Sequence, residues 1–247
     1  NQIYSNAEEF YRAENGHAIG YFWGYQTAGI FQNQQEITDW IAAGNGVLQT
    51  NVQPGDVKYV DVNHDGQINA SDKVDLGNGL PKYTFGFNIS LSWKGFDLSA
   101  NATGAAGFKI AQSYRDPNSS QGNYSRQILD RWTGEGTSNK IPRVTYGDVG
   151  NWQFSDLYLQ DGDYIRLQNL TLGYDFKRLI SWKGISKLRL YVQAQNLFTL
   201  TKYDGMDPEI GSYNGTNGNS SDSWVSGVDM GYYPHPRTFL VGMNVAF

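Results

Sequence analysis

One stretch of the chain carries oxygen-bearing side chains at the spacing of a calcium-binding loop. Residues 61–72 match the pattern D-x-[DN]-x-[DN]-G, with Asp61, Asn63 and Asp65 at loop positions one, three and five. Gly66 at position six permits the sharp turn that such a loop needs. The residues predicted to supply calcium ligands are Asp61, Asn63, Asp65, Gln67 and Asp72.

The same loop departs from the calcium pattern and admits a second explanation. Position twelve is Asp72, where calcium loops usually carry a bidentate glutamate, and no flanking helices of the EF-hand kind are evident. Aspartate and asparagine side chains also hold turns together by hydrogen bonding to nearby backbone groups. A bound Ca²⁺ and a self-supporting turn are therefore both compatible with the sequence.

No spacing of titratable side chains indicates a catalytic centre. Carboxylates are plentiful, but none is marked as the facing pair that glycoside hydrolysis requires. The three histidines, His17, His64 and His235, do not form a metal-binding pattern. His235 stands between two prolines, where we expect a structural role. We therefore expect that the protein is not an enzyme.

The elements that must position these residues are long strands with two different faces. Residues 82–93 and 96–103 both alternate between apolar and polar side chains, which is the period of an extended strand. Lys94-Gly95 is a tight connection between them, so this stretch is predicted to form a β-hairpin. Each arm is about ten residues, near the length that a tilted strand needs to cross a bilayer. Tyr83 and Trp93, at the two ends of the first arm, match the aromatic girdles of outer-membrane barrels.

The pattern repeats along the chain. Further strands are predicted at residues 19–31, 163–176, 187–199 and 237–247, which gives about six in all. Short helices are predicted around residues 7–12, 36–43 and 125–132. If Phe247 faces the periplasm, every long connection falls outside and both short links fall inside. A soluble β-sandwich shares the alternation, but it is not expected to sort its connections in this way.

Composition narrows the class of protein. The chain has 247 residues, of which 15% are aromatic, 29 are glycine and only 17% are charged, a profile typical of strands and turns. The net charge of −5 and the lack of a basic stretch argue against a nucleic-acid partner. The absence of cysteine excludes disulfides, and the absence of an apolar run of about 18 residues excludes a transmembrane helix. Because the chain begins at Asn1, we expect a processed chain or a fragment.

Several stretches resemble the SusC/RagA-like TonB-dependent outer-membrane transporters of Bacteroidetes. They occur in the family's order and are distributed along most of the chain: 24–31, 55–68, 80–88, 163–174, 195–199, 205–209 and 233–247. The resemblance implies an all-β fold in which residues 1–247 are the C-terminal portion of a large transmembrane β-barrel. Its long extracellular loops are expected at about 33–80, 108–160 and 200–235. Because such barrels have about 22 strands, the plug domain and the other strands must belong to the remainder of the same transporter.

The resemblance also implies a function and a set of partners. An importer of this family takes up oligosaccharides or peptides together with a SusD-like surface lipoprotein. The TonB–ExbB–ExbD complex drives it through a part of the transporter outside this chain. The expected location is the outer membrane, where the barrel contacts lipid, and Phe247 is expected to be the signal read by the assembly machinery.

Loop residues are candidates for contact with the substrate. Aromatic rings stack on sugars, and charged side chains can line a cavity, but packing between loops or against the lipoprotein is an alternative role for the aromatic residues. The residues predicted to contact substrate are Trp132, Trp152, Trp224 and Arg115. A secreted calcium-dependent carbohydrate-binding β-domain is the second interpretation of the whole chain. The loop at 61–72 and the abundant Trp and Tyr support it, whereas the sorted connections and the terminal Phe247 favour the barrel.

Overall fold

The computed structural model describes residues 4–5, 10–112, 126–145, 150–180, 183–211, 226–229 and 231–247. The chain divides into two compact units. The first unit comprises Asn1–Leu80, Lys109–Gln160 and Ile210–Gly231. The second unit comprises Pro81–Phe108, Asp161–Glu209 and Tyr232–Phe247.

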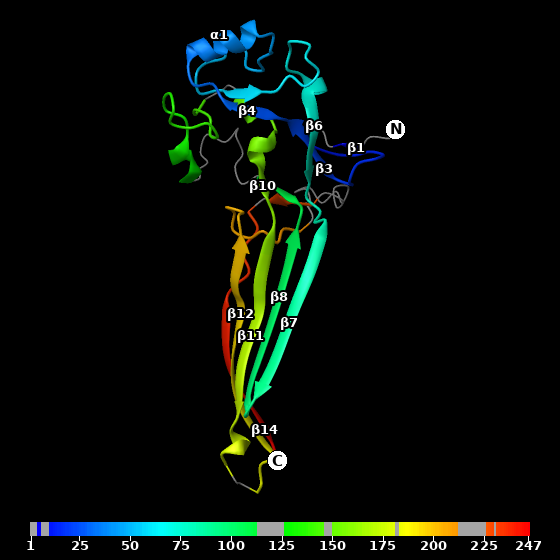
Figure 1. Cartoon of the computed structure of the whole chain (residues 1–247), viewed down its shortest axis with the longest axis vertical. Coiled ribbons are helices and arrows are strands. Elements are labelled where there is room, and N and C mark those ends of the chain that lie inside the picture. Colours follow the sequence, from blue (N-terminus) through cyan, green and yellow to red (C-terminus); the bar gives the residue numbers. More distant parts are fainter. Residues whose placement is uncertain are drawn as a thin grey trace. The chain divides into compact units, whose positions relative to one another are not determined.

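The second unit is built on one long sheet of five strands, which lie side by side in Figure 1. Their order across the sheet is β14-β12-β11-β8-β7, and every neighbouring pair is antiparallel. The strands are β7 (Tyr83–Trp93), β8 (Phe96–Ala106), β11 (Tyr164–Asp175), β12 (Lys187–Thr201) and β14 (Thr238–Ala246). The predicted hairpin and the predicted strands that follow it are therefore confirmed.

The register of the long sheet separates apolar from hydrophilic side chains across its whole width. Residues directly opposite each other on paired strands share a face. One face carries rows such as Leu91, Leu98, Leu172, Val192 and Val241. The next row toward the short links is Trp93, Phe96, Tyr174, Leu190 and Met243. The opposite face carries hydrophilic rows such as Asn88, Asn101, Asn169, Gln195 and Thr238.

The apolar face of the long sheet is exposed over much of its extent. Phe87, Trp93 and Val241 retain 58%, 67% and 83% of their accessible surface. Scattered exposed apolar residues are ordinary, but a continuous exposed apolar face marks a contact surface. The alternation seen in the sequence therefore does not build a soluble core in this unit.

The connections of the long sheet are sorted by length. The turn at Lys94 and Gly95 has positive φ at both residues, +48° and +93°, as a two-residue hairpin turn of type I′ requires. The other short link, between β11 and β12, lies at the same end of the sheet. The connections that lead to the first unit leave from the opposite ends of the strands. The predicted sorting is confirmed at the level of topology.

The first unit contains three small sheets. A four-stranded sheet has the order β1 (Tyr4–Ser5), β2 (Tyr11–Ala13), β3 (Tyr21–Tyr25) and β6 (Lys73–Asn78). A three-stranded sheet consists of β10 (Leu159–Asp161), β9 (Lys109–Gln112) and β13 (Val228–Asp229), and β4 (Thr27–Ile30) pairs with β5 (Val57–Tyr59). Two buried clusters hold this unit together: Tyr11, Phe22, Ala111 and Val228 form one, and Tyr25, Ile30, Val57, Tyr59 and Ile68 form the other.

The stretch at 19–31 was expected to be one of about six similar strands, but it divides into β3 and β4 in two of the small sheets. Beside the break, the backbone lies close to that of Phe154. The N–H of Tyr25 donates to the carbonyl of Phe154 at 3.0 Å, and a Cβ on Gly24 would lie 2.6 Å from that carbonyl oxygen. The long sheet therefore has five strands in the described part of the chain.

The predicted helices have three different outcomes. The helix expected at 36–43 is confirmed as α1 (Gln34–Ala42), capped by Asn33, whose side chain accepts the N–H of Glu36 at 2.9 Å. The helix expected around 7–12 is wrong where the structure describes it, because Tyr11 begins strand β2 and pairs with Phe22. The helix expected at 125–132 is a short 3₁₀ turn, Arg126–Asp130.

Four further 3₁₀ turns occur in the described residues: η1 (Ala70–Asp72), η3 (Gly150–Trp152), η4 (Asp156–Tyr158) and η5 (Phe176–Arg178). The last of them begins the link after β11. Within the described ranges, no helix combines the length and the apolar character needed to cross a membrane.

Candidate functional site

The predicted calcium loop folds as a compact turn around the carboxylate of Asp61. The N–H of Gly66 donates to Asp61 Oδ2 at 2.7 Å, and the N–H of Asp65 donates to Oδ1 at 3.2 Å. Gly66 has φ +80°, so the sharp turn predicted at this glycine is confirmed. The side chain of Asp61 is buried although it carries a charge.

Asp72, at position twelve of the loop, closes the turn from the other end. Its side chain is fully buried, and its Oδ1 and Oδ2 accept the N–H groups of Val62 at 3.0 Å and Asn69 at 2.8 Å. The side chain of Asn69 caps η1 in return. These are the hydrogen bonds of a self-supporting turn. A carboxylate oxygen can nevertheless accept more than one bond, so the same atoms retain capacity for a cation.

The other predicted ligands lie on the outer side of this loop. Asp65 Oδ1 accepts the N–H of Gln67 at 2.9 Å, and Asp65 Oδ2 accepts from Asn63 Nδ2 at 2.9 Å. Both Asp65 and Asn63 are exposed. The loop offers oxygen ligands, which is the chemistry that Ca²⁺ prefers. Among the described residues, however, the carboxylates of Asp61, Asp65 and Asp72 do not all lie within 4.8 Å of one another.

Two of the four residues predicted to contact substrate, Trp132 and Trp152, lie among the described residues. Trp132 packs against the buried cluster that contains Tyr25 and Tyr59, and a Cβ on Gly55 would lie 2.5 Å from its ring. This placement favours the packing role over substrate contact. Trp152 is half-buried in η3. Arg115 and Trp224 lie outside the described residues.

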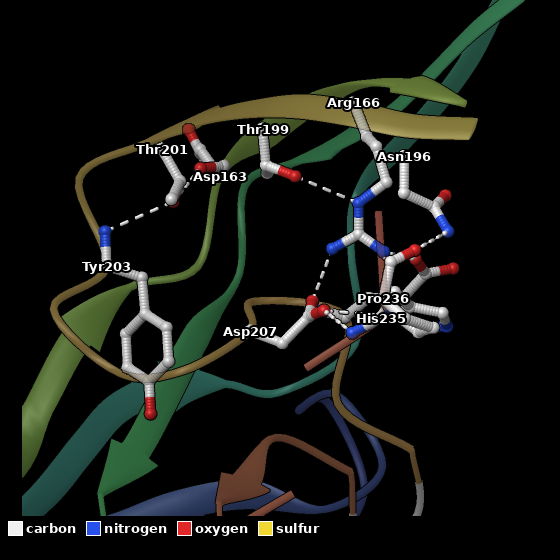
Figure 2. Close-up of polar contacts among 10 residues, drawn as sticks. Asp163, Arg166, Asn196, Thr199, Thr201, Tyr203, Asp207, His235 and Pro236 are labelled. Carbon is white, nitrogen blue, oxygen red and sulfur yellow. Dashed lines mark hydrogen bonds and ion pairs between the residues drawn. The ribbon is translucent and has the colours of Figure 1, made fainter. Parts of the chain in front are cut away.

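A buried ion-pair cluster that the sequence analysis did not single out centres on Arg166 (Figure 2). Arg166 lies on the hydrophilic face of the long sheet and retains only 2% of its accessible surface. Its Nε donates to Thr199 Oγ1 at 2.9 Å, and its Nη1 donates to Glu209 Oε2 at 2.8 Å. Its Nη2 forms an ion pair with Asp207 Oδ1. One guanidinium therefore binds three partners at once.

Asp207 links Arg166 to His235. Asp207 Oδ1 accepts the N–H of Glu209 at 2.9 Å, and Oδ2 accepts the N–H of His235 at 3.1 Å. Burial alone would raise the pKa of Asp207, but the hydrogen bonds from His235, from these two N–H groups and from Arg166 outweigh it and hold that pKa below its usual value. The carboxylate is therefore charged at neutral pH.

The same cluster contains three side chains that could bind a metal ion, but an arginine already lies among them. Ligand atoms of Asp207, Glu209 and His235 lie within 4.8 Å of one another. However, Arg166 Nη1 lies 2.8 Å from both Glu209 Oε2 and His235 Nδ1, and Nη2 contacts Asp207. The guanidinium already supplies the positive charge that a metal would bring. His235, which we expected to be structural, is a member of this cluster.

A shallow groove of about 430 Å³ lies beside the cluster on the hydrophilic face. Its lining includes the ring of Tyr164, the amide of Gln168, the carboxylate of Glu209 and the hydroxyls of Thr84 and Thr103. An aromatic ring among hydroxyl, amide and carboxylate groups can bind either sugars or peptides, because both present hydroxyl or amide groups next to apolar surface.

Comparison with known proteins identifies relatives of this chain, although no protein-family model matches it. The chain is 32% identical over 234 residues to TonB-dependent receptor P3 of Formosa agariphila, covering 94% of this chain and 22% of the receptor. It is 29% identical over 206 residues to TonB-dependent receptor SusC of Bacteroides thetaiotaomicron, covering 81% of this chain and 18% of the receptor.

Solved structures show the same fold. The structure of the RagAB peptide transporter matches 99% of this chain and 25% of its own chain, with a TM-score of 0.69 and 22% identity. The RagAB peptide importer in its open-open state matches 100% of this chain and 24% of its own, with a TM-score of 0.67 and 21% identity.

These findings and the two-faced sheet define the class. The five long strands are a section of the wall of a transmembrane β-barrel, because one face is apolar throughout and the sheet is not closed. The chain belongs to the SusC/RagA-like TonB-dependent outer-membrane transporters of Bacteroidetes. It spans about a fifth of the length of the curated relatives it matches.

Proposed function

We propose that the chain is part of an outer-membrane importer that takes up oligosaccharides or peptides together with a SusD-like surface lipoprotein. The observation that carries this proposal is the apolar face of the long sheet, which runs without interruption from β7 to β14. Lipid is the environment in which such a face is stable.

The edges of the sheet support the same proposal. Strands β7 and β14 are the outer strands, and open strand edges do not occur against lipid. Each edge therefore requires a neighbouring strand from the remainder of the transporter. In the closed barrel, the hydrophilic face with its groove would line the passage. The names of the relatives suggest dependence on TonB, and import would then be driven by TonB with ExbB and ExbD, as the family resemblance implies.

The test uses the full-length protein that contains this chain, purified from outer membranes in mild detergent. We expect a surface lipoprotein in a stoichiometric complex with it and a bound glycan or peptide identifiable by mass spectrometry. A chain that is secreted, folded and soluble without detergent would overturn the proposal in favour of a carbohydrate-binding β-domain. Contact of Trp132, Trp152, Trp224 or Arg115 with substrate, and the role of Phe247 in assembly, stay predictions.

We further propose that the loop at 61–72 binds Ca²⁺, which would stiffen the loop and take no part in any chemistry. The spacing of its ligands supports this, and so does the burial of Asp61 and Asp72. Backbone N–H groups reach both carboxylates, but they do not neutralise the charge. A buried charge is costly unless a counter-charge offsets it, and a divalent cation would do so.

A further inference from the structure

We propose that Arg166 is a tether that fixes both ends of the connection between β12 and β14 to the hydrophilic face of the barrel wall. This connection comprises residues 202–237, and both of its ends lie in the second unit. The inference depends on the fold of the wall and not on what the transporter imports.

The two ends of the connection are joined to each other by Asp207. Its carboxylate accepts the N–H of Glu209, at the same end, and the N–H of His235, which is 28 residues further along the chain. The ring of His235 also lies against this carboxylate, with Nδ1 2.9 Å from Oδ2. The two ends of the connection are therefore held together by hydrogen bonds to one carboxylate.

Arg166 attaches the joined ends to the wall. It contacts Thr199 on β12 and both acidic residues of the first end, and it reaches the second end through Asp207, whose Oδ2 accepts the N–H of His235. A planar guanidinium with five N–H donors can serve partners in several directions, whereas the ammonium of a lysine cannot reproduce that geometry. The tether thus depends on arginine and not only on positive charge.

Strands β11 and β12 are irregular near Arg166. The pairing of β11 shifts register between Leu167 and Asn169 against both of its neighbours. Gln168 is an extra residue against β8, whereas on β12 two residues, Asn196 and Leu197, face it. On the facing part of β12, Asn196 has φ +50° and its side chain donates to the carbonyl of Pro236 at 3.1 Å. Bulges re-aim side chains at the rims of barrels. Here Asn196 lies near Arg166 and contacts Pro236 at the second end of the connection directly (Figure 2).

Burial makes the tether strong. Arg166 and Asp207 retain 2% and 4% of their accessible surface. Removing one partner of a buried ion pair leaves the other charge uncompensated, which costs far more than losing an exposed pair. Without Arg166, the carboxylates of Asp207 and Glu209 would also face each other without a cation between them. Both ends of the connection should then leave the wall together.

The test is hydrogen exchange on the full-length protein in mild detergent, read by mass spectrometry on peptides that contain the amides of Glu209 and His235. In Arg166→Gln, we expect both amides to exchange about a hundredfold faster, since their acceptor loses its anchor. The matched control is Arg189→Gln. Arg189 pairs with Asp97 on the same hydrophilic face, with Nε 2.8 Å from Oδ1, and lies near the start of β12, whereas the connection follows the end of that strand.

The outcomes separate clearly. Faster exchange at both ends in Arg166→Gln, with no change in Arg189→Gln, supports the tether. Equal exchange in the two variants, or faster exchange at one end only, overturns it. If Arg166→Gln fails to reach the outer membrane, Asp207→Asn takes its place, because it keeps the size of the side chain and removes the charge. We then expect about a tenfold increase at both amides, and unchanged exchange refutes the proposal.

Discussion

A charge placed on the apolar face of the wall should destabilise the protein far more than the same charge one residue away. Leu170 and Thr171 are neighbours near the middle of β11 and point to opposite faces. Leu170 lies in an apolar row with Ala100 and Ala194, whereas Thr171 lies opposite Ser99 and Gln193. The pair therefore compares the two faces at the same depth.

The magnitude follows from this depth. An arginine on the lipid face near the middle of the membrane costs about 2–4 kcal/mol, and the cost falls to roughly 0–1 kcal/mol near the interfaces. We expect Leu170→Arg to lose about 2–4 kcal/mol of unfolding free energy. We expect Thr171→Arg to lose less than about 1 kcal/mol, because its side chain faces the hydrophilic side.

The assay is reversible unfolding of the full-length protein in phospholipid vesicles by guanidinium, followed by tryptophan fluorescence. Since about 1.4 kcal/mol changes an equilibrium tenfold, a difference of this size is easily resolved. If both substitutions cost the same, or if Thr171→Arg costs more, the assignment of the two faces is wrong. The interpretation of the long sheet as a barrel wall would then fail with it.

Three further predictions concern the loop, a glycine and the tether. The double variant Asp61→Ala, Asp65→Ala should lower the calcium content measured by atomic emission and speed proteolysis of residues 61–72; unchanged metal content would show that the turn holds itself. Gly104→Ala should lower the unfolding free energy by about 1–3 kcal/mol, because its Cβ would lie 2.5 Å from the Phe85 ring and from the Tyr164 carbonyl. Gly86→Ala, with nothing nearer than 4.0 Å, is its control in the same unfolding assay. The pKa of Asp207 is depressed in the folded state, so its stabilising effect is present above its unfolded pKa of about 3.9 and lost as pH falls through the lower folded value. The stability difference between the wild type and Asp207→Asn should therefore be constant above about pH 5 and shrink below about pH 4.

The parts of the fold that were predictable depend on neighbours in sequence. The alternation in β7 and β8 fixes which side chains share a face, and a two-residue turn at Lys94-Gly95 fixes how the strands pair. The turn at Gly66 was predictable for the same reason, since the carboxylate that holds it is only five residues away. Spacing alone carries this information, because each interaction is short-range.

The parts that were missed depend on residues far apart in sequence. The stretch at 19–31 contains strand-like residues, but β3 and β4 have different partner strands, and Tyr25 beside the break binds the carbonyl of Phe154, more than a hundred residues later. The sequence left two roles open for Trp132, contact with substrate and packing, and the core of distant strands on which it packs could not be named from the sequence. Local propensity cannot report such contacts, because tertiary context overrides it.

The Arg166 cluster shows what such distant contacts mean for the family resemblance. Four of the stretches through which the chain resembles its family, 163–174, 195–199, 205–209 and 233–247, each contribute at least one member of the cluster. None of these members needs a ligand to explain it, because each has a partner within the cluster. The attachment of the connection to the barrel wall therefore explains the family resemblance at these positions. Residues that distinguish one imported substrate from another should accordingly be sought outside this cluster, where side chains are not already committed to one another.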